Sequence, residues 1–132
     1  MSHEVVLPEG WPRPKGYANA VLAKGRQLYI AGMIGWDADQ HFHSDDFGDQ
    51  ARQALKNIAD VLKEAGAKPE NIVRMTWYVT DKREYLKRSK EIGAVFRELI
   101  GSFNAAMTAV QVAALIEDRA QVEIEVTAVL PD

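Results

Sequence analysis

The last third of the chain, residues 105–130, contains the sequence pattern that most restricts the fold. Apolar and other side chains alternate strictly through residues 122–128, which is the period of a β-strand with one buried and one open face. The buried set is Val122, Ile124, Val126 and Ala128, and the open set is Glu123, Glu125 and Thr127. This alternation predicts a strand that presents two carboxylates on one face.

The segment before it also alternates, with Met107, Ala109 and Gln111 on one parity and Thr108, Val110 and Val112 on the other. A polar turn at residues 117–119 separates the two segments and predicts that they form a hairpin. We expect the set that includes Met107 to share the half-polar face with Glu123. Whether that face meets water, another subunit or a ligand decides what the protein does.

The other elements are predicted from the same periods and from turn residues. Strands are expected at residues 17–23, 27–35 and 72–80, and helices at residues 51–65 and 85–100. The first helix has an apolar stripe, a cap at Ser44 or an adjacent aspartate, and a stop at Gly66. A cap at Asp81 introduces the second helix. The order β-β-α-β-α-β-β fits an α+β domain with both helices on one face of a sheet.

The opposite face of that sheet needs a cover. We assign four large side chains to it, beside the two glutamates: Tyr29, Met33, Tyr78 and Met107. Exposure of so much apolar surface is unfavourable, so self-association into a symmetric oligomer is the simplest prediction.

A length of 132 residues, with 47% hydrophobic and 27% charged residues, fits one domain over residues 1–132, of which residues 1–16 form an extended arm. No apolar run approaches a membrane span. The absence of cysteine excludes thiol nucleophiles, disulfides and thiolate metal sites. The net charge of -3 offers nucleic acid no electrostatic footprint. Residues 1–10 lack the pattern of a secretory signal, so the cytoplasm is the expected location.

A polar connection at residues 36–47 carries candidate metal ligands, namely Asp37, Asp39, His41, His43 and Asp45. Carboxylates and imidazoles are competent ligands for zinc or manganese. The spacing matches no calcium loop, because the turn glycine and the later acidic residue are missing. A solvated connection is therefore the preferred interpretation, and neither a metal nor another cofactor is expected.

No Ser-His-Asp triad, P-loop or dinucleotide fingerprint can be assigned. A carboxylate on a partly apolar face can act as a general acid or base when desolvation raises its pKa, and Glu123 and Glu125 both qualify. The alternative is that each pairs with an arginine or caps a subunit contact, and spacing alone favours that alternative.

Several stretches along nearly the whole chain resemble the Rid family, also known as the RidA, YjgF or L-PSP endoribonuclease family. The matching stretches are Gly-Tyr-Ala-Asn-Ala at residues 16–20, Leu-Tyr-Ile-Ala-Gly-Met at 28–33, Gln-Ala-Arg-Gln-Ala-Leu-Lys-Asn at 50–57, Val-Gln-Val-Ala-Ala-Leu at 110–115 and Val-Glu-Ile-Glu at 122–125. The resemblance implies a chorismate-mutase-like (ferredoxin-like) fold. It also implies a homotrimer around a barrel-like centre, with three clefts between subunits.

Well-known members of that family hydrolyse enamines and imines such as 2-aminoacrylate, using an arginine that pairs with the substrate carboxylate. The family's Arg-Ser-Cys-Val aligns with residues 107–110, so the arginine is Met107 here and the cysteine is Ala109. Other cleft positions differ as well, because Ala31 replaces a serine and Ser89 an asparagine.

The family's Tyr17, Gly32 and Glu123 are retained. The implied site therefore has Glu123 as the catalytic residue, with Tyr17, Ala31, Gly32, Ser89, Met107 and Ala109 binding the substrate. A methionine cannot form the bidentate pair. The candidates for a replacement cation are Arg13, Lys15 and Arg119.

The resemblance favours a homotrimer with a small-molecule cleft that hydrolyses an enamine or imine other than the standard one. The altered residues make the cleft more apolar and favour a neutral or aromatic ligand. A non-catalytic trimer that binds a metabolite or a protein is the alternative. A ribonuclease ranks third, because the chain is acidic and lacks a basic surface interleaved with aromatic residues.

Overall fold

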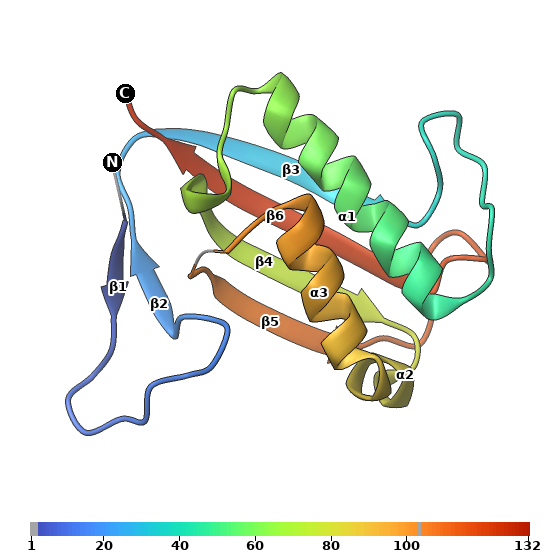
Figure 1. Cartoon of the computed structure of the whole chain (residues 1–132), viewed down its shortest axis with the longest axis horizontal. Coiled ribbons are helices and arrows are strands. Elements are labelled where there is room, and N and C mark those ends of the chain that lie inside the picture. Colours follow the sequence, from blue (N-terminus) through green and yellow to red (C-terminus); the bar gives the residue numbers. More distant parts are fainter. Residues whose placement is uncertain (1–2, 103) are drawn as a thin grey trace.

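Four strands form the main sheet of the computed structural model, which describes residues 3–102 and 104–132 (Figure 1). Their order across the sheet is β3-β6-β4-β5. The strands are β3 (Arg26–Ile34), β4 (Ile72–Val79), β5 (Ala106–Gln111) and β6 (Val122–Leu130). β6 pairs antiparallel with both β3 and β4, whereas β4 and β5 run parallel. The alternation in β6 is as predicted, since Val122, Ile124, Val126 and Ala128 are all buried.

The long helices α1 (Phe47–Glu64) and α3 (Ser89–Leu99) cover one face of this sheet (Figure 1). The Asp46 carboxylate accepts a hydrogen bond from the Asp49 amide and caps α1, as expected for an aspartate near Ser44. The apolar stripe of α1 is buried and supplies much of the core, with Ala51, Ala54, Leu55, Ile58 and Leu62. The predicted α+β architecture is therefore confirmed. Among the described residues, no helix has both the length and the apolar character needed to cross a membrane.

The second predicted helix is divided at Arg88 into α2 (Lys82–Lys87) and α3. Asp81 caps α2 by accepting a hydrogen bond from the Arg83 amide. The guanidinium of Arg88 forms two hydrogen bonds with the Asp46 carboxylate and also contacts Glu84 and Glu91. This ion cluster fastens the junction of α2 and α3 to the start of α1.

The predicted hairpin over residues 105–130 is wrong. β4 lies between β5 and β6, and β5 is parallel to β4. The chain crosses from β4 to β5 through α2 and α3, which is the connection that parallel neighbours require. Residues 112–121 then carry the chain from the edge strand past β4 to β6.

The predicted placement of Met33 and Met107 on the open face of the sheet is also wrong. A β-bulge in β3 between Ile30 and Met33 shifts the register, so that Met33 pairs with Ile124 and packs against the core. Met107 pairs with the buried Met75 and packs against the same core. Both methionines therefore lie on the helix side of the sheet.

The predicted strand at residues 17–23 is shorter and pairs elsewhere. β2 (Ala20–Leu22) joins β1 (Glu4–Val6) in a separate two-stranded ribbon (Figure 1). The loop between them returns to the main sheet at Ala18, whose amide donates to the Ala105 carbonyl at 2.9 Å. That contact brings the loop to the edge strand β5.

Candidate functional site

A cavity of about 820 Å³ lies between the β5 edge of the sheet, helix α3 and the loop that precedes β2. Its volume falls within the usual range for small-molecule sites. Its lining residues include Tyr17 from the loop, Trp77 and Met107 from the sheet, and Ser89 and Phe96 from α3. A metabolite-sized ligand fits such a space.

The floor of this cavity is formed by neighbouring strands in register. Met75 pairs with Met107, and Trp77 pairs with Ala109, so all four side chains point to the helix side. Trp77 is 1% exposed and packs edge-on against Tyr85, with ring centroids 5.7 Å apart. Burial raises the pKa of Tyr85, so its phenol remains neutral at physiological pH. The floor is therefore apolar and aromatic.

Ser89, Gly93 and Arg97 form one wall, because residues four apart on α3 share a face of the helix. Sequence reasoning identified Ser89 through the family resemblance and missed Gly93 and Arg97. The i, i+4, i+8 spacing from Ser89 is the signal that points to both of them.

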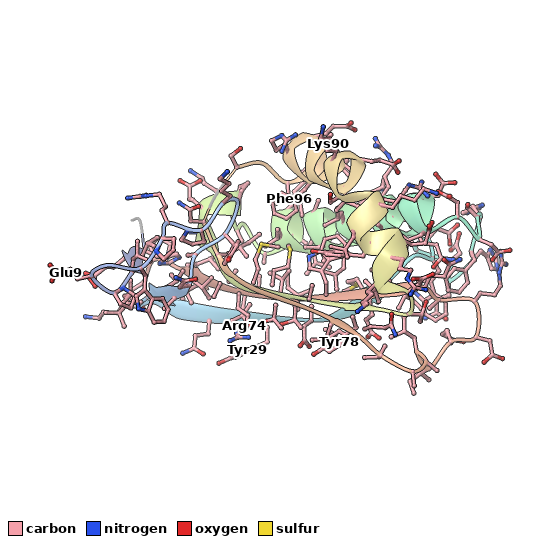
Figure 2. The ribbon with its side chains drawn as sticks, turned by 90° about the horizontal axis from the view of Figure 1, so that it is seen from below. Glu9, Tyr29, Arg74, Tyr78, Lys90 and Phe96 are labelled. Atoms are coloured by element: carbon pink, nitrogen blue, oxygen red, sulfur yellow. The ribbon has the colours of Figure 1, made fainter. Side chains whose placement is uncertain are left out.

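Glu123 and Gly32 lie on the open face of the sheet rather than in this cavity. Glu123 alternates with the buried residues of β6 and pairs with Tyr78, which projects from the face opposite Phe96 (Figure 2). A Cβ placed at Gly32 would lie 1.9 Å from Glu123 Oε2. The carboxylate of Glu123 thus lies directly over the Gly32 backbone, and Ala31 lies beside it in the bulge.

The neighbouring glutamate is already engaged. The Tyr78 hydroxyl donates a hydrogen bond of 2.6 Å to Glu125 Oε1, and this bond is the main reason that the pKa of Tyr78 is raised. Among the described residues, Glu123 accepts no comparable side-chain hydrogen bond. Of the two carboxylates, Glu123 is therefore the one available to a ligand.

The site residues expected from the sequence fall into two groups within one chain. Tyr17, Ser89, Met107 and Ala109 line the cavity on the helix side, whereas Ala31, Gly32 and Glu123 lie on β3 and β6. Met107 and Ala109 do not share a face with Glu123, contrary to the prediction. The two groups lie on opposite sides of the sheet.

The three candidate cations also separate. Lys15 lines the cavity, and Arg13 lines a smaller hollow of about 220 Å³ that shares Tyr17 with it. Arg119 is engaged elsewhere: its Nε donates to Asp45 at 2.9 Å, and its guanidinium lies 5.3 Å from the Phe42 ring centroid.

The polar connection around Asp37 is organised by internal hydrogen bonds. His43 Nε2 lies 2.5 Å from Asp37 Oδ2, and the amides of Asp39 and His41 donate to the other oxygen. These bonds, with that to His43 the strongest, lower the pKa of Asp37 to about 2. Within the part of the chain that the structure describes, no three potential ligands are grouped to hold a metal ion.

Fold and cavity together define a small α+β domain with a ligand-sized cavity at the edge of a mixed four-stranded sheet. The family model described as endoribonuclease L-PSP matches residues 12–130. A RutC family protein of Pyrococcus horikoshii is 32% identical over 126 residues, which cover 95% of this chain and 96% of the relative. A human 2-iminobutanoate/2-iminopropanoate deaminase is 33% identical over 114 residues, which cover 86% of this chain and 79% of the relative.

A solved structure gives the same result. A Rid-family protein of unknown function from Yersinia pestis superposes with a TM-score of 0.77 at 33% identity, and the match covers 98% of this chain and 100% of that one. The chain belongs to the endoribonuclease L-PSP family, which is the family of the RidA and YjgF proteins.

Proposed function

We propose that the protein is a homotrimer that hydrolyses an enamine or imine in clefts between its subunits. The observation that carries this proposal is the separation of the site residues. Tyr17 and Met107 line the cavity beside β5, whereas Gly32 and Glu123 lie on the far side of the same sheet. Two such half-sites act on one ligand when the open face of one copy meets the cavity edge of another.

The open face supports self-association on physical grounds. Tyr29 is 71% exposed and Val110 is 41% exposed, and Arg74, Tyr78 and the two glutamates of β6 occupy the same face (Figure 2). An uncovered sheet face of this mixed character suits a contact between subunits better than it suits water.

Glu123 is the proposed catalytic residue. Water adds to the carbon of the C=N bond, the nitrogen leaves as ammonia, and the carbon becomes a carbonyl. A carboxylate that accepts a hydrogen bond from the attacking water orients it, and it can return the proton to the departing nitrogen. The position of Glu123 over Gly32, without a side-chain partner among the described residues, leaves its oxygens available for this role.

The substrate is proposed to differ from 2-aminoacrylate, which is small and relies on the arginine that Met107 replaces. A thioether provides no hydrogen-bond donor and no charge. The floor of the cavity beside Met107 and Ala109 includes the side chains of Trp77 and Tyr85, and this apolar surface supports a substrate with a larger apolar part. The human relative carries the name of a deaminase of small imino acids, and the same type of reaction with another substrate is proposed here.

The direct test is ammonia release from 2-aminoacrylate and from bulkier imines, each generated enzymatically in the assay. We expect turnover of a bulkier imine that falls at least about a hundredfold in the Glu123→Gln variant, within the range of a general acid-base contribution. Glu125→Gln is the matched control, because Glu125 is engaged by Tyr78. Rates at background for every imine would contradict the proposal.

A non-catalytic trimer that captures a metabolite is the second candidate, and the replacement of the family's arginine by Met107 favours it. A thermal-shift screen separates the two, because a ligand that stabilises the protein without being consumed indicates binding alone.

The ribonuclease activity in the family's description fits less well, since the chain has a net charge of -3. The proposed location is the cytoplasm, with residues 1–132 acting as one Rid-like domain.

A further inference from the structure

The cavity beside β5 differs in charge from the rest of the chain. The whole chain carries 19 acidic and 16 basic residues, yet none of the residues that line the cavity is an aspartate or a glutamate. Two lining residues are cationic, Lys15 from the loop and Arg97 from α3. A cavity with two positive charges and no carboxylate in an acidic protein selects an anion.

Arg97 is the better placed of the two for a directed contact. Its Nη1 lies 3.4 Å from the position that a Cβ would take at Gly93, so the guanidinium folds back over the preceding turn of α3. Gly93 and Ser89 line the cavity on the same helix face. At that distance a Cβ at residue 93 would be in ordinary van der Waals contact with the guanidinium, so the position of Arg97 does not depend on the glycine.

Three other arginines of the described chain are held by carboxylates. Arg52 pairs with Glu98, Arg88 with Asp46, and Arg119 with Asp45. Among the described residues, neither Arg97 nor Lys15 makes a side-chain hydrogen bond or an ion pair. Their charges are therefore available to a ligand in the cavity.

The remainder of the lining combines aromatic and apolar side chains with small polar ones such as Ser102, Asn104 and Thr108. Tyr17, Phe96 and Met107 present two rings and a thioether to the cavity. Trp77 also lines it, and its buried Nε1 has no hydrogen-bond partner in the described chain. An apolar, ring-sized group packs well against these aromatic and thioether side chains.

From these contacts we infer that Arg97, assisted by Lys15, holds the carboxylate of a ligand whose apolar, ring-sized body lies against Trp77, Phe96 and Met107. The anionic group is thus bound from the helix wall, and not from residue 107 on β5. The ligand class is an organic acid with a bulky apolar side chain. Its identification as a 2-imino acid rests on the proposed function, whereas the carboxylate contact does not.

Binding is tested with 3-phenylpropanoate as the probe, by calorimetry on the full-length protein. The neutral 3-phenylpropanamide tests the need for charge, and acetate tests the need for the apolar body. We expect 3-phenylpropanoate to bind more tightly than either. Equal affinity for the acid and the amide would overturn the inference.

The variants Arg97→Gln and Lys15→Gln identify the cations. We expect Arg97→Gln to weaken binding of 3-phenylpropanoate about tenfold, with Arg97→Lys restoring part of it, and Lys15→Gln to weaken it several-fold. Lys90→Gln is the matched control on the same helix, because Lys90 projects away from the sheet (Figure 2). An effect of Lys90→Gln equal to that of Arg97→Gln would show that only general charge matters, and would contradict the inference.

Turnover separates this inference from the proposed function. The imine formed when an amino-acid oxidase acts on phenylalanine is compared with that from alanine. If ammonia is released and Arg97→Gln raises KM for the phenylalanine imine with little change in kcat, both hold. If no imine is hydrolysed but binding of 3-phenylpropanoate still depends on Arg97, the carboxylate site is supported and the proposed deaminase activity is contradicted. If turnover and KM do not depend on Arg97 or Lys15, the deaminase stands and the carboxylate site is wrong.

Discussion

The carboxylate of Glu123 occupies the space that a side chain at residue 32 would need. A Cβ built on Gly32 would lie 1.9 Å from Glu123 Oε2, 2.7 Å from its Cδ and 2.9 Å from its Cγ. Gly32 lies where the bulge in β3 shifts the pairing with β6. The glycine and the bulge together bring this glutamate onto the backbone of the neighbouring strand.

Gly32→Ala should therefore displace the Glu123 side chain while leaving the fold intact. Real Cβ atoms do not approach so closely, and the contacted atoms belong to the end of a flexible, half-buried side chain that is able to move. We expect deaminase activity to fall at least about tenfold, because the proposed acid-base group moves from its position. The melting temperature should change by only a few degrees.

A double mutant shows whether the effect of Gly32→Ala acts through Glu123. In a Glu123→Gln background, Gly32→Ala should cause little further loss, since the group it displaces is already inactive. If the fold-losses of deaminase activity in the two single variants multiply in the double mutant, residue 32 affects turnover independently of Glu123.

Gln50 is a buried connector between α1 and the two loops beside it. It is 1% exposed, its Nε2 donates to the carbonyls of Ser44 and Arg119, and its Oε1 accepts from the Gln121 amide. Gln50→Ala leaves these three backbone groups unpartnered and should lower the free energy of unfolding by roughly 2–4 kcal/mol. Urea denaturation measures the loss.

The matched control for Gln50 is Gln53→Ala on the same helix. Among the described residues, Gln53 bonds only to the side chain of Asn57, and it is half-buried, so the expected loss is about 1 kcal/mol or less. Equal losses in the two variants would show that the three backbone bonds of Gln50 contribute little.

The ion pair between Arg88 and Asp46 predicts a pH-dependent stability. The Arg88 guanidinium, helped by the Asp49 amide, lowers the pKa of Asp46 below the ordinary value of an aspartate. A carboxyl group whose pKa is lower in the folded state stabilises the fold above the unfolded pKa, and this contribution disappears as the pH falls through the folded pKa. Arg88→Gln should therefore lower the free energy of unfolding at pH 6. The difference between the variant and the wild type should shrink as the pH drops below the pKa of the Asp46 carboxyl in the unfolded state.

Arg83→Gln is the control for this pH series, because Arg83 is exposed and has no side-chain ion pair in the described chain. Its effect should be small at every pH. A deficit in Arg88→Gln that persists unchanged at pH 2 would mean that packing, and not the carboxylate, accounts for the role of Arg88.

Tyr29 tests the proposed oligomer. Its side chain is 71% exposed and projects from the open face of the sheet (Figure 2). Tyr29→Asp places a charge where a second copy is proposed to pack, and should shift the protein from trimer toward monomer in sedimentation velocity. Leu86→Asp is the matched control, since Leu86 is 64% exposed on α2. A wild-type protein that sediments as a monomer would contradict the trimer at once.

The elements that could be predicted from the sequence are those in which one local period decides the outcome. The apolar stripe of α1, with Ala54 and Leu55 fully buried, and the alternation around Ile124 both indicate their buried faces directly. The cap at Asp46 follows from the same local chemistry. The family resemblance then defined the overall fold.

The errors arose where local periods do not determine pairing. In β5 both parities are of mixed polarity, so alternation cannot tell which of Met107 and Thr108 faces the helices. That choice is made by the parallel register with β4, which brings Met107 beside Met75. The bulge that turns Met33 into the core likewise depends on pairing with β6. Arg97 was missed because no motif marks it, and its spacing from Ser89 becomes informative only once the cavity is known.

Met107→Arg tests whether the cavity beside β5 still serves the family's usual reaction. Met107 is half-buried at the cavity floor, so the stem of an arginine can lie along the apolar wall while its guanidinium reaches the ligand space. We expect ammonia release from 2-aminoacrylate to rise at least about tenfold, which corresponds to about 1.4 kcal/mol of additional binding in the transition state. The partly buried charge should cost roughly 1–2 kcal/mol of stability.

Two further substitutions separate charge from geometry at this position. Met107→Lys adds a charge without the planar fork and should give a smaller gain, whereas Met107→Leu keeps the apolar volume and should leave the rate unchanged. A folded Met107→Arg protein with no gain, in a preparation that hydrolyses the bulkier imine, would indicate that the ligand carboxylate does not approach residue 107. The bulkier imine itself should gain nothing from Met107→Arg, because its carboxylate is held by Arg97 on the helix wall and an arginine at residue 107 would face its apolar body.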